Sequence, residues 1–220
     1  MDIASLIGPT LPPRHPEVRA IMATTMFGAF TRDGTSGPLG NRTDSALLSG
    51  LRDWAGCILV GAETVRREGY GRSPTPLAVL SSSLNLDPAS DLFGGSVTVL
   101  CPERALHDAS LAARRDALSA AGARLVSVGS GSAPEILDAL RRLGHARISC
   151  EGGPGVYSSM LAAGLVDVVH VTVDPSISAT DGSWGLELAG VTPFHHRYRI
   201  EAAEVDGGAM LFCRYRRVRP

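Results

Sequence analysis

The sequence predicts an α/β fold, with a mostly parallel sheet covered by helices on both faces and a C-terminal antiparallel hairpin. Short apolar runs alternate along the chain with segments of helical periodicity. The runs are continuous, as in strands that are buried on both faces. The last two strand-like segments meet at Gly207-Gly208, which indicates a hairpin. We see no interior linker, so we expect one domain over residues 19–220 after an extended, proline-rich arm over residues 1–18.

The elements follow in chain order from the same patterns. A first strand is expected at 19–27, followed by a glycine-punctuated loop at 28–41. Thr43 or Asp44 could cap a helix that runs to Trp54. Further strands are expected at 56–61, 76–81, 96–101, 123–129, 146–151 and 167–175. A second helix is expected to start after residue 61 and to end at about Glu68. Further helices are expected at 103–121, 134–143 and 154–163. A glycine-rich segment, "SATDGSWG", precedes the hairpin.

Charge and hydropathy exclude several classes of protein. The net charge is −1, which gives no electrostatic reason to expect nucleic-acid or anionic-membrane partners. No stretch of 18 or more apolar residues could span a bilayer. All 21 basic residues are arginine, so Schiff-base lysine chemistry and a Walker-A lysine are excluded.

The four cysteines have no metal-binding spacing. Each lies in or at the end of an apolar run, which favours buried, reduced thiols in a cytoplasmic protein. The six histidines also lack ligand spacing with carboxylates, so we expect no bound metal.

The stretch "CEGGPGVYSSML" points to an anion site. Pro154 suits the first position of a helix, and Gly164 suits the position just past its end. Glu151, Gly152 and Gly153 then form a tight turn from strand to helix, where free amides and the helix dipole meet. Glycines would let a pyrophosphate approach this backbone closely. A plain glycine turn is the alternative.

A second glycine pattern, "GSGSAP" at 129–134, imitates the dinucleotide fingerprint G-x-G-x-x-G. Its third position is Pro134, and too few strand–helix units follow it for a complete dinucleotide-binding fold. We therefore expect it not to be that motif, although Gly129 could still lie against a cofactor.

Several segments together resemble the reductase domain of riboflavin-biosynthesis deaminase/reductases, which has a dihydrofolate-reductase-like fold. They are "DGTSGPLGN", "CILVGAETVRREGYG", "LAVLSSSLNLDP", "CEGGPGVYSSMLAAGLVDVVHVTVDP" and "FCRYRR", which span roughly residues 19–218. The resemblance is greatest to stand-alone members labelled pyrimidine reductase. The zinc deaminase motifs do not occur in the sequence, so deamination is not expected.

The resemblance implies NADPH-dependent hydride transfer to 5-amino-6-(5-phosphoribosylamino)uracil, and a homodimer with the C-terminal strands near its interface. It places the following residues along NADPH: Thr24, Gly61, Thr64, Val65, Ser81, Ser82, Gly129, Gly152, Gly153, Pro154 and Gly155. Ser81 and Ser82, with Ser83 next to them as a third donor, would bind the 2′-phosphate; a polar turn is the alternative.

On the substrate side, the resemblance places Ser36, Arg52 and Arg72 where the family binds the sugar phosphate. A guanidinium holds a phosphate in bidentate fashion, although Arg52 could also be a solvated helix charge. Glu68 is the expected catalytic residue, because it replaces a family aspartate that lies near the substrate. The acceptor carbon would lie between Glu68 and the strand end at Thr24 and Thr25, and Glu151 could also face it.

The match fails at two polar positions of the presumed substrate edge. The family pattern S-L-D-G becomes Thr25-Met26-Phe27-Gly28, and a substrate-contacting lysine is replaced at about Ile21. Phe27 could stack on a planar heterocycle or fill core. Two rival functions follow: dihydrofolate reduction on the same fold, and NADPH binding without turnover.

Overall fold

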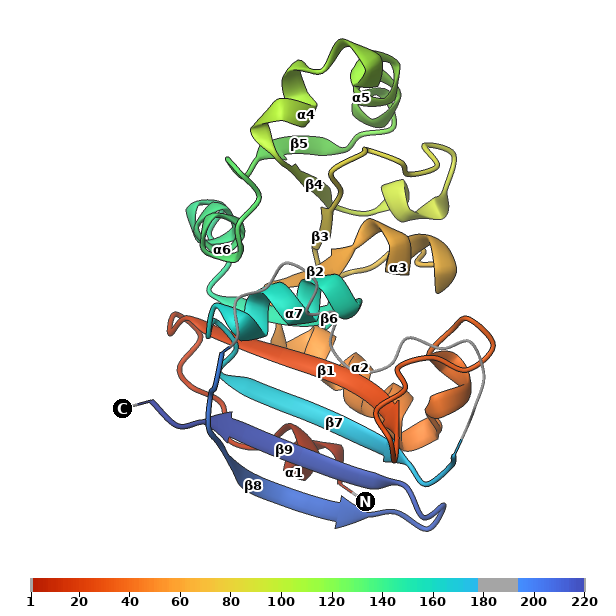
Figure 1. The fold of residues 1–220 in the computed structure, drawn as a ribbon, viewed down its shortest axis with the longest axis vertical. Helices are drawn as coiled ribbons and strands as arrows, with labels where there is room; N and C mark the ends of the chain where they lie inside the picture. The colour runs from red at the N-terminus through yellow and green to blue at the C-terminus, as the bar shows by residue number, and fades with distance from the viewer. Residues whose placement is uncertain (1, 178–193, 220) are drawn as a thin grey trace.

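The computed structural model describes residues 2–177 and 194–219, and these residues form the α/β fold that the sequence predicts (Figure 1). One sheet holds nine strands in the order β5-β4-β3-β2-β6-β1-β7-β9-β8 within this described part. The strands from β5 to β7 run parallel, and β9 and β8 continue the sheet as an antiparallel hairpin. The strands are β1 (Glu17–Thr25), β2 (Cys57–Gly61), β3 (Leu77–Leu80), β4 (Val97–Cys101), β5 (Arg124–Ser127), β6 (Arg147–Gly152), β7 (Val168–Asp174), β8 (Tyr198–Val205) and β9 (Leu211–Arg217).

Helices cover both faces of the sheet. They are α1 (Ile3–Ile7), α2 (Arg42–Trp54), α3 (Ala62–Arg67), α4 (Glu103–His107), α5 (Ala112–Ala120), α6 (Ala133–Arg142) and α7 (Pro154–Ala162). Helices α6 and α7 pack on one face, whereas α1, α2 and α3 pack on the other. The expected segment "SATDGSWG" lies outside the described residues.

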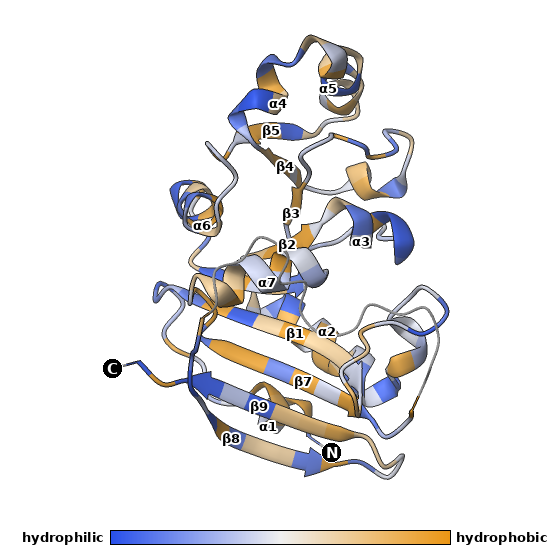
Figure 2. Ribbon diagram, viewed as in Figure 1, coloured by the Kyte–Doolittle hydropathy of each residue, from blue (hydrophilic) through white to orange (hydrophobic). Residues whose placement is uncertain are grey.

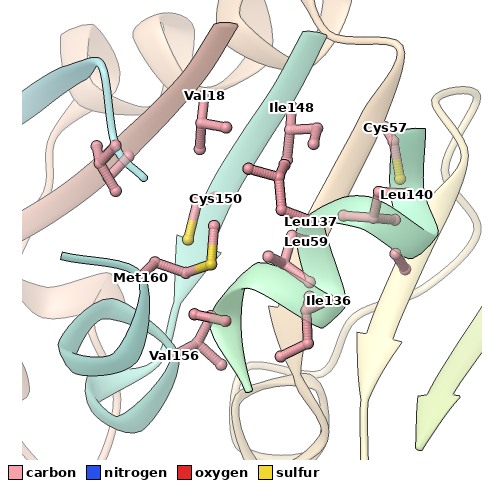
Figure 3. Close-up of a cluster of buried hydrophobic side chains, with 14 of the residues drawn as sticks. Val18, Cys57, Leu59, Ile136, Leu137, Leu140, Ile148, Cys150, Val156 and Met160 are labelled. Atoms are coloured by element: carbon pink, nitrogen blue, oxygen red, sulfur yellow. The ribbon is translucent and has the colours of Figure 1, made fainter. Parts of the chain in front are cut away.

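Strand β2 shows why its apolar run is continuous. Cys57 and Leu59 join the core under α6 and α7, while Ile58 and Val60 join the core under α3. All four side chains are fully buried, and burying each large aliphatic side chain contributes about 1.5–3 kcal/mol. Figure 3 shows the first core, and in Figure 2 hydrophobic residues concentrate along β2, β3 and β4 while the outer helices are more hydrophilic.

The prediction of an extended arm over residues 1–18 is wrong for its first part. Ile3–Ile7 form α1, which packs on α2 and β9. Leu6 is buried there. The guanidinium groups of Arg19 and Arg214 donate to carbonyls at and just beyond the end of α1, at 2.7–2.9 Å. These bonds satisfy carbonyls that the end of a helix leaves free.

The expected helix over 103–121 is interrupted. It divides at Asp108 into α4 and α5 with a 3₁₀ turn, Ala109–Leu111, between them. The Asp108 side chain accepts the amide hydrogen of Ser110 at 2.8 Å, so this aspartate caps a new turn instead of continuing the helix. The cap of α2 also differs: Asn41, rather than Thr43 or Asp44, accepts the first amides.

His170 is a buried side chain on β7 that is only 1% exposed. Its Nε2 has no hydrogen-bond partner among the described residues. Burial, followed by the nearby guanidinium groups of Arg19, Arg214 and Arg216, lowers the pKa of His170 to about 3. The folded protein therefore holds a neutral imidazole that the unfolded chain would protonate at mildly acidic pH.

Acidification from pH 7 to pH 5 is expected to destabilise the protein through His170. The unfolded pKa of about 6.5 exceeds the folded value, so this stability is complete above pH 6.5 and is lost as pH falls toward 3. One unmatched proton changes the free energy of unfolding by about 1.4 kcal/mol per pH unit. When the free energy of unfolding is measured by urea unfolding at several pH values, its slope against pH should be shallower for His170→Gln than for wild type. His15→Gln, which removes an exposed histidine, should keep the wild-type slope, and equal slopes in all three proteins would contradict the prediction.

Candidate functional site

A cavity of about 1190 Å³ opens where the parallel strands end. Its wall includes residues at the carboxyl ends of β2, β3 and β6, together with parts of β1, α2, α3 and α7. Strands β2 and β6 are neighbours, but β2 continues through α3 to β3 on one side and β6 continues through α7 to β7 on the other. Ligands of open α/β sheets bind at such a reversal of direction.

The N-terminus of α7 supplies free donors to this cavity. Gly153 is the N-cap, Pro154 is the first helical residue, and the first turn has no acidic residue and no side-chain cap. The amides of Gly155 and Val156 lie in this turn, where a helix has no internal acceptor for them, and both residues line the cavity. The arrangement favours an anion.

The glycines of this turn are required by close approaches. Gly152 has a φ of +80°, and a Cβ there would lie 2.3 Å from the ring of Tyr157. A Cβ on Gly153 would lie 2.6 Å from Thr64 Oγ1, on the neighbouring helix α3. The turn of β6 and the start of α3 therefore form a narrow cradle that any side chain at 153 would fill.

A serine-rich wall lies at the end of β3. Ser81, Ser82 and Ser83 line the cavity, and the buried Ser81 Oγ has no partner among the described residues. Buried hydroxyls are normally hydrogen-bonded, so this atom suits a ligand. Arg104, on α4, lines the same cavity and adds a positive charge.

The segment at 129–134 does not provide a binding site for an anion. Glu135 caps α6 itself: its carboxylate accepts the amide hydrogens of Ser130 and Ser132 at 3.1 Å. The hydroxyls of these serines, with those amides, lower the pKa of Glu135 to about 2. A carboxylate thus occupies the position that a phosphate would need, as expected for a false fingerprint.

Arg52 and Glu151 form a bidentate ion pair in the cavity wall. Arg52 Nε and Nη2 donate to the two carboxylate oxygens at 2.7 and 2.6 Å. The Tyr70 hydroxyl also donates to Glu151 Oε2 at 2.6 Å, and its ring lies 5.2 Å from the guanidinium carbon. The hydrogen bond to Glu151 raises the pKa of Arg52, and burial raises the pKa of Tyr70. One edge of Arg52 is therefore committed to Glu151 rather than free for a phosphate.

Glu68 and Ser36, which both line the cavity, are joined by a hydrogen bond. Glu68 ends α3, and its Oε1 accepts the Ser36 amide hydrogen at 2.8 Å. This bond ties the loop before α2 to α3. The stem of Arg72 lies beside Gly94 and Gly95, and its guanidinium has no ion pair within the described ranges.

The structure brings together most of the residues that the sequence analysis assigns to a site. The cavity is lined by Ser36, Arg52, Glu68, Arg72 and Glu151 of the substrate set and by Gly61, Thr64, Ser81, Ser82, Gly153, Pro154 and Gly155 of the cofactor set. Their roles stay predictions.

Six other assigned residues lie outside the cavity wall, and their roles also stay predictions. Thr24 and the buried Thr25 form local hydrogen bonds at the strand end. Phe27 is 67% exposed, so it does not fill core, and it is not among the residues that line the cavity. Val65 is buried in the core under α3, Gly129 lies against Glu135, and Gly152 lies beneath Tyr157.

The cavity wall also contains Asp44, Tyr70 and Arg104, for which the sequence predicts no ligand. The sequence pattern predicts Asp44 only as a helix cap. Tyr70 stands inside the family motif without an assigned role, and Arg104 lies near the start of a segment that the sequence predicts as one long helix. Within the described residues, no group of three or more His, Cys, Asp or Glu could hold a metal, and no helix could cross a membrane. The four cysteines are free and buried, as expected.

Comparison with known proteins agrees with this architecture. A pyrimidine reductase-like protein from Corynebacterium diphtheriae superposes with a TM-score of 0.88 at 31% identity, covering 99% of both chains. A diaminohydroxyphosphoribosylaminopyrimidine deaminase/5-amino-6-(5-phosphoribosylamino)uracil reductase from Thermotoga maritima gives 0.70 at 18% identity, covering 93% of this chain and 57% of that one.

The fold is that of dihydrofolate reductase. The Enterococcus faecalis dihydrofolate reductase, solved in complex with NADP(H), gives a TM-score of 0.55 at 16% identity, covering 91% of this chain and 96% of that one. No curated protein sequence matches the chain significantly. The family model of the RibD C-terminal domain matches residues 16–179. The chain therefore belongs to the RibD C-terminal domain family, a family of reductases.

Proposed function

We propose that this protein is an NADPH-dependent reductase of a pyrimidine-type heterocycle, with 5-amino-6-(5-phosphoribosylamino)uracil as its acceptor in riboflavin biosynthesis. The observation that carries the proposal is the narrow cradle between Gly153 and Thr64 at the N-terminus of α7. Family membership supports the reaction class, and the reductase activity for which the Thermotoga maritima relative is named supports the acceptor.

The residues present fit a reduced nicotinamide dinucleotide. The amides of the first turn of α7 and the Thr64 hydroxyl would hold its pyrophosphate. The unpartnered Ser81 Oγ, with Ser82 and Arg104, would receive the adenosine 2′-phosphate. When bound, this coenzyme supplies a hydride; the protein's part is to bind and orient the two reactants.

The other end of the cavity would hold the phosphorylated acceptor. Arg72 is the cavity arginine at this end whose guanidinium is unpaired within the described part of the chain, so we propose that it binds the sugar phosphate. The Arg52 edge not used by Glu151 retains three of the five guanidinium donors and could assist. Glu68, which holds the Ser36 loop, would close the cavity around the substrate.

We further propose a cytoplasmic homodimer. The free, buried cysteines suit a reducing compartment. The edge strand β8 exposes Ile200 and Val205, each 64% accessible, and unpaired edge strands with apolar residues commonly associate. Sedimentation of the wild-type protein should give the mass of two chains, and a monomer across micromolar concentrations would exclude the dimer.

A direct assay tests the activity. We expect NADPH oxidation, monitored as loss of NADPH absorbance, when the aminouracil phosphate is added. With dihydrofolate we expect little or no oxidation. Preference for dihydrofolate would replace the proposed acceptor with a pteridine. Tight NADPH binding by calorimetry without oxidation by either compound would reduce the protein to a nucleotide-binding homologue, and no binding would overturn the reductase proposal.

A further inference from the structure

Asp44 is a carboxylic acid in the cavity wall that the capping of α2 leaves available. Asn41 Oδ1 accepts the amide hydrogens of Thr43 and Asp44, so the Asp44 side chain is not needed as a cap. Instead Asp44 Oδ1 accepts a hydrogen bond from the hydroxyl of buried Thr172, on β7, at 2.6 Å. Helix α2 and strand β7 thus hold one oxygen of this carboxyl in a fixed position.

The second oxygen, Oδ2, lies beside Gly40. A Cβ on residue 40 would come within 2.6 Å of Oδ2, and Gly40 itself lines the cavity. Gly40 has a φ of −107°, which any residue can adopt, so conformation does not require a glycine here. The missing side chain leaves Oδ2 uncovered at the cavity wall.

The surroundings of Asp44 favour its protonated form. Ile21, Met22 and Leu48 line the same cavity, and Asp44 forms no ion pair with any described residue. Burial raises the pKa of Asp44, against the opposing hydrogen bond from Thr172. The titratable or charged groups on the surrounding elements are His170, Asp174 paired with Arg32, Tyr157, Asp206 bonded to Asn41, and the pair Arg52–Glu151.

Three other acidic groups of the cavity, Glu151, Glu68 and Tyr70, already form hydrogen bonds within the protein. Both oxygens of Glu151 accept hydrogen bonds from Arg52, which stabilises the ionised form. Glu68 accepts the backbone hydrogen of Ser36, and Tyr70 donates its proton to Glu151. In this set, Asp44 is the acid whose pKa is raised by burial and whose second oxygen has no hydrogen-bond partner among the described residues.

We propose that Asp44 is the catalytic acid that protonates the acceptor from Oδ2, while Thr172 positions the carboxyl through Oδ1. This inference rests on the proposed function. Reduction of a C=N bond adds one hydride to carbon, sends the π electron pair to nitrogen, and requires one proton there. The reduced nicotinamide coenzyme is oxidised as it gives the hydride. Asp44 gives the proton, remains as a carboxylate, and regains a proton from water in the cavity. A substrate that displaces water from Oδ2 would favour the protonated acid further.

The decisive experiment compares Asp44→Asn, Thr172→Val and Gly40→Ala with the surface control Asp116→Asn in single-turnover NADPH oxidation across pH. General acid catalysis contributes roughly 10²–10⁴-fold, so Asp44→Asn should be slower by that factor. The wild-type rate should fall as rising pH deprotonates the acid, and this fall should be absent in Asp44→Asn. Thr172→Val keeps the acid but removes the bond that lowers its pKa, so that fall should move to higher pH. Gly40→Ala should slow turnover by covering Oδ2, and Asp116→Asn should match wild type.

A second readout does not depend on turnover. Carbon-13 NMR titration of the free protein, with Asp44→Asn used for assignment, should place the Asp44 pKa above the ordinary value of about 3.9. An ordinary value would overturn the inference. So would a wild-type rate and pH profile in Asp44→Asn, while the reductase activity would stand. If the wild-type protein oxidises no NADPH, the proposed function fails and this inference fails with it.

Discussion

Replacing Arg52 with alanine is expected to lower the free energy of unfolding by about 3 kcal/mol, because it leaves the Glu151 carboxylate buried without its cation. Glu151 is only 3% exposed, whereas Arg52 is 32% exposed. Water can therefore enter where the guanidinium was, which places the effect at the lower end of the usual 3–5 kcal/mol for breaking a buried pair. The Tyr70 hydroxyl would remain as a partner of the carboxylate.

The control for this prediction is Arg67→Ala, which breaks an exposed i,i+4 pair with Glu63 on α3 and should cost well under 1 kcal/mol. The double variant Arg52→Ala/Glu151→Gln should recover part of the lost stability, since it removes the stranded charge. Urea unfolding of the four proteins measures these differences. If Arg52→Ala were no less stable than Arg67→Ala, the pair would not be a structural element, and Arg52 would be free to serve the substrate alone.

The Arg52–Glu151 pair also shows what the sequence could not reveal. The two residues are 99 positions apart, and each had a sensible separate interpretation as a phosphate ligand or a turn residue. Only the packing of α2 beside β6 brings them together. Local patterns predicted both elements, because an apolar run and a helical period are written in consecutive residues. They could not predict which charges the assembled sheet would neutralise.

Where local chemistry dominates, sequence reasoning succeeded. Continuous apolar runs marked strands buried on both faces, and the Gly-Gly-Pro order marked the start of α7. It failed where one side chain competes with the backbone. Asp108 caps a new turn and divides a helix that its composition favours, and Asn41 takes the capping role from Asp44. The second failure concealed a cavity acid, because a capping role accounts for Asp44 in the sequence without any ligand.

Phe27 illustrates a different limit. Aligning it with a family aspartate suggested a role at the substrate edge, yet its side chain lies in solvent beyond the end of β1. Position along a motif fixes where the backbone passes but not which way a side chain turns after a strand ends. The carboxylates that do line the cavity, including Asp44, lie outside the four-residue pattern that contains Phe27.

Gly153→Ala is expected to weaken NADPH binding by about tenfold or more, equivalent to about 1.4 kcal/mol. Its backbone has a φ of −76°, so alanine is compatible with the conformation and the effect must come from space. The new methyl would lie 2.6 Å from Thr64 Oγ1 and occupy the cradle where the pyrophosphate should meet the amides of α7. Overpacking of this kind typically costs about 1–3 kcal/mol.

A double-mutant cycle with Thr64→Ala separates the two consequences of that methyl group. If the methyl acts only by pushing Thr64, then adding Gly153→Ala to the Thr64→Ala protein should cost no further affinity in calorimetry. If the methyl blocks the anion, the loss should persist in that background. Gly207→Ala, in an exposed turn with open space around its Cβ, is the matched control and should bind NADPH as wild type does. Unchanged NADPH affinity in Gly153→Ala itself would mean that the pyrophosphate does not lie at this turn, because an anion gripped by these amides cannot share their space with a side chain.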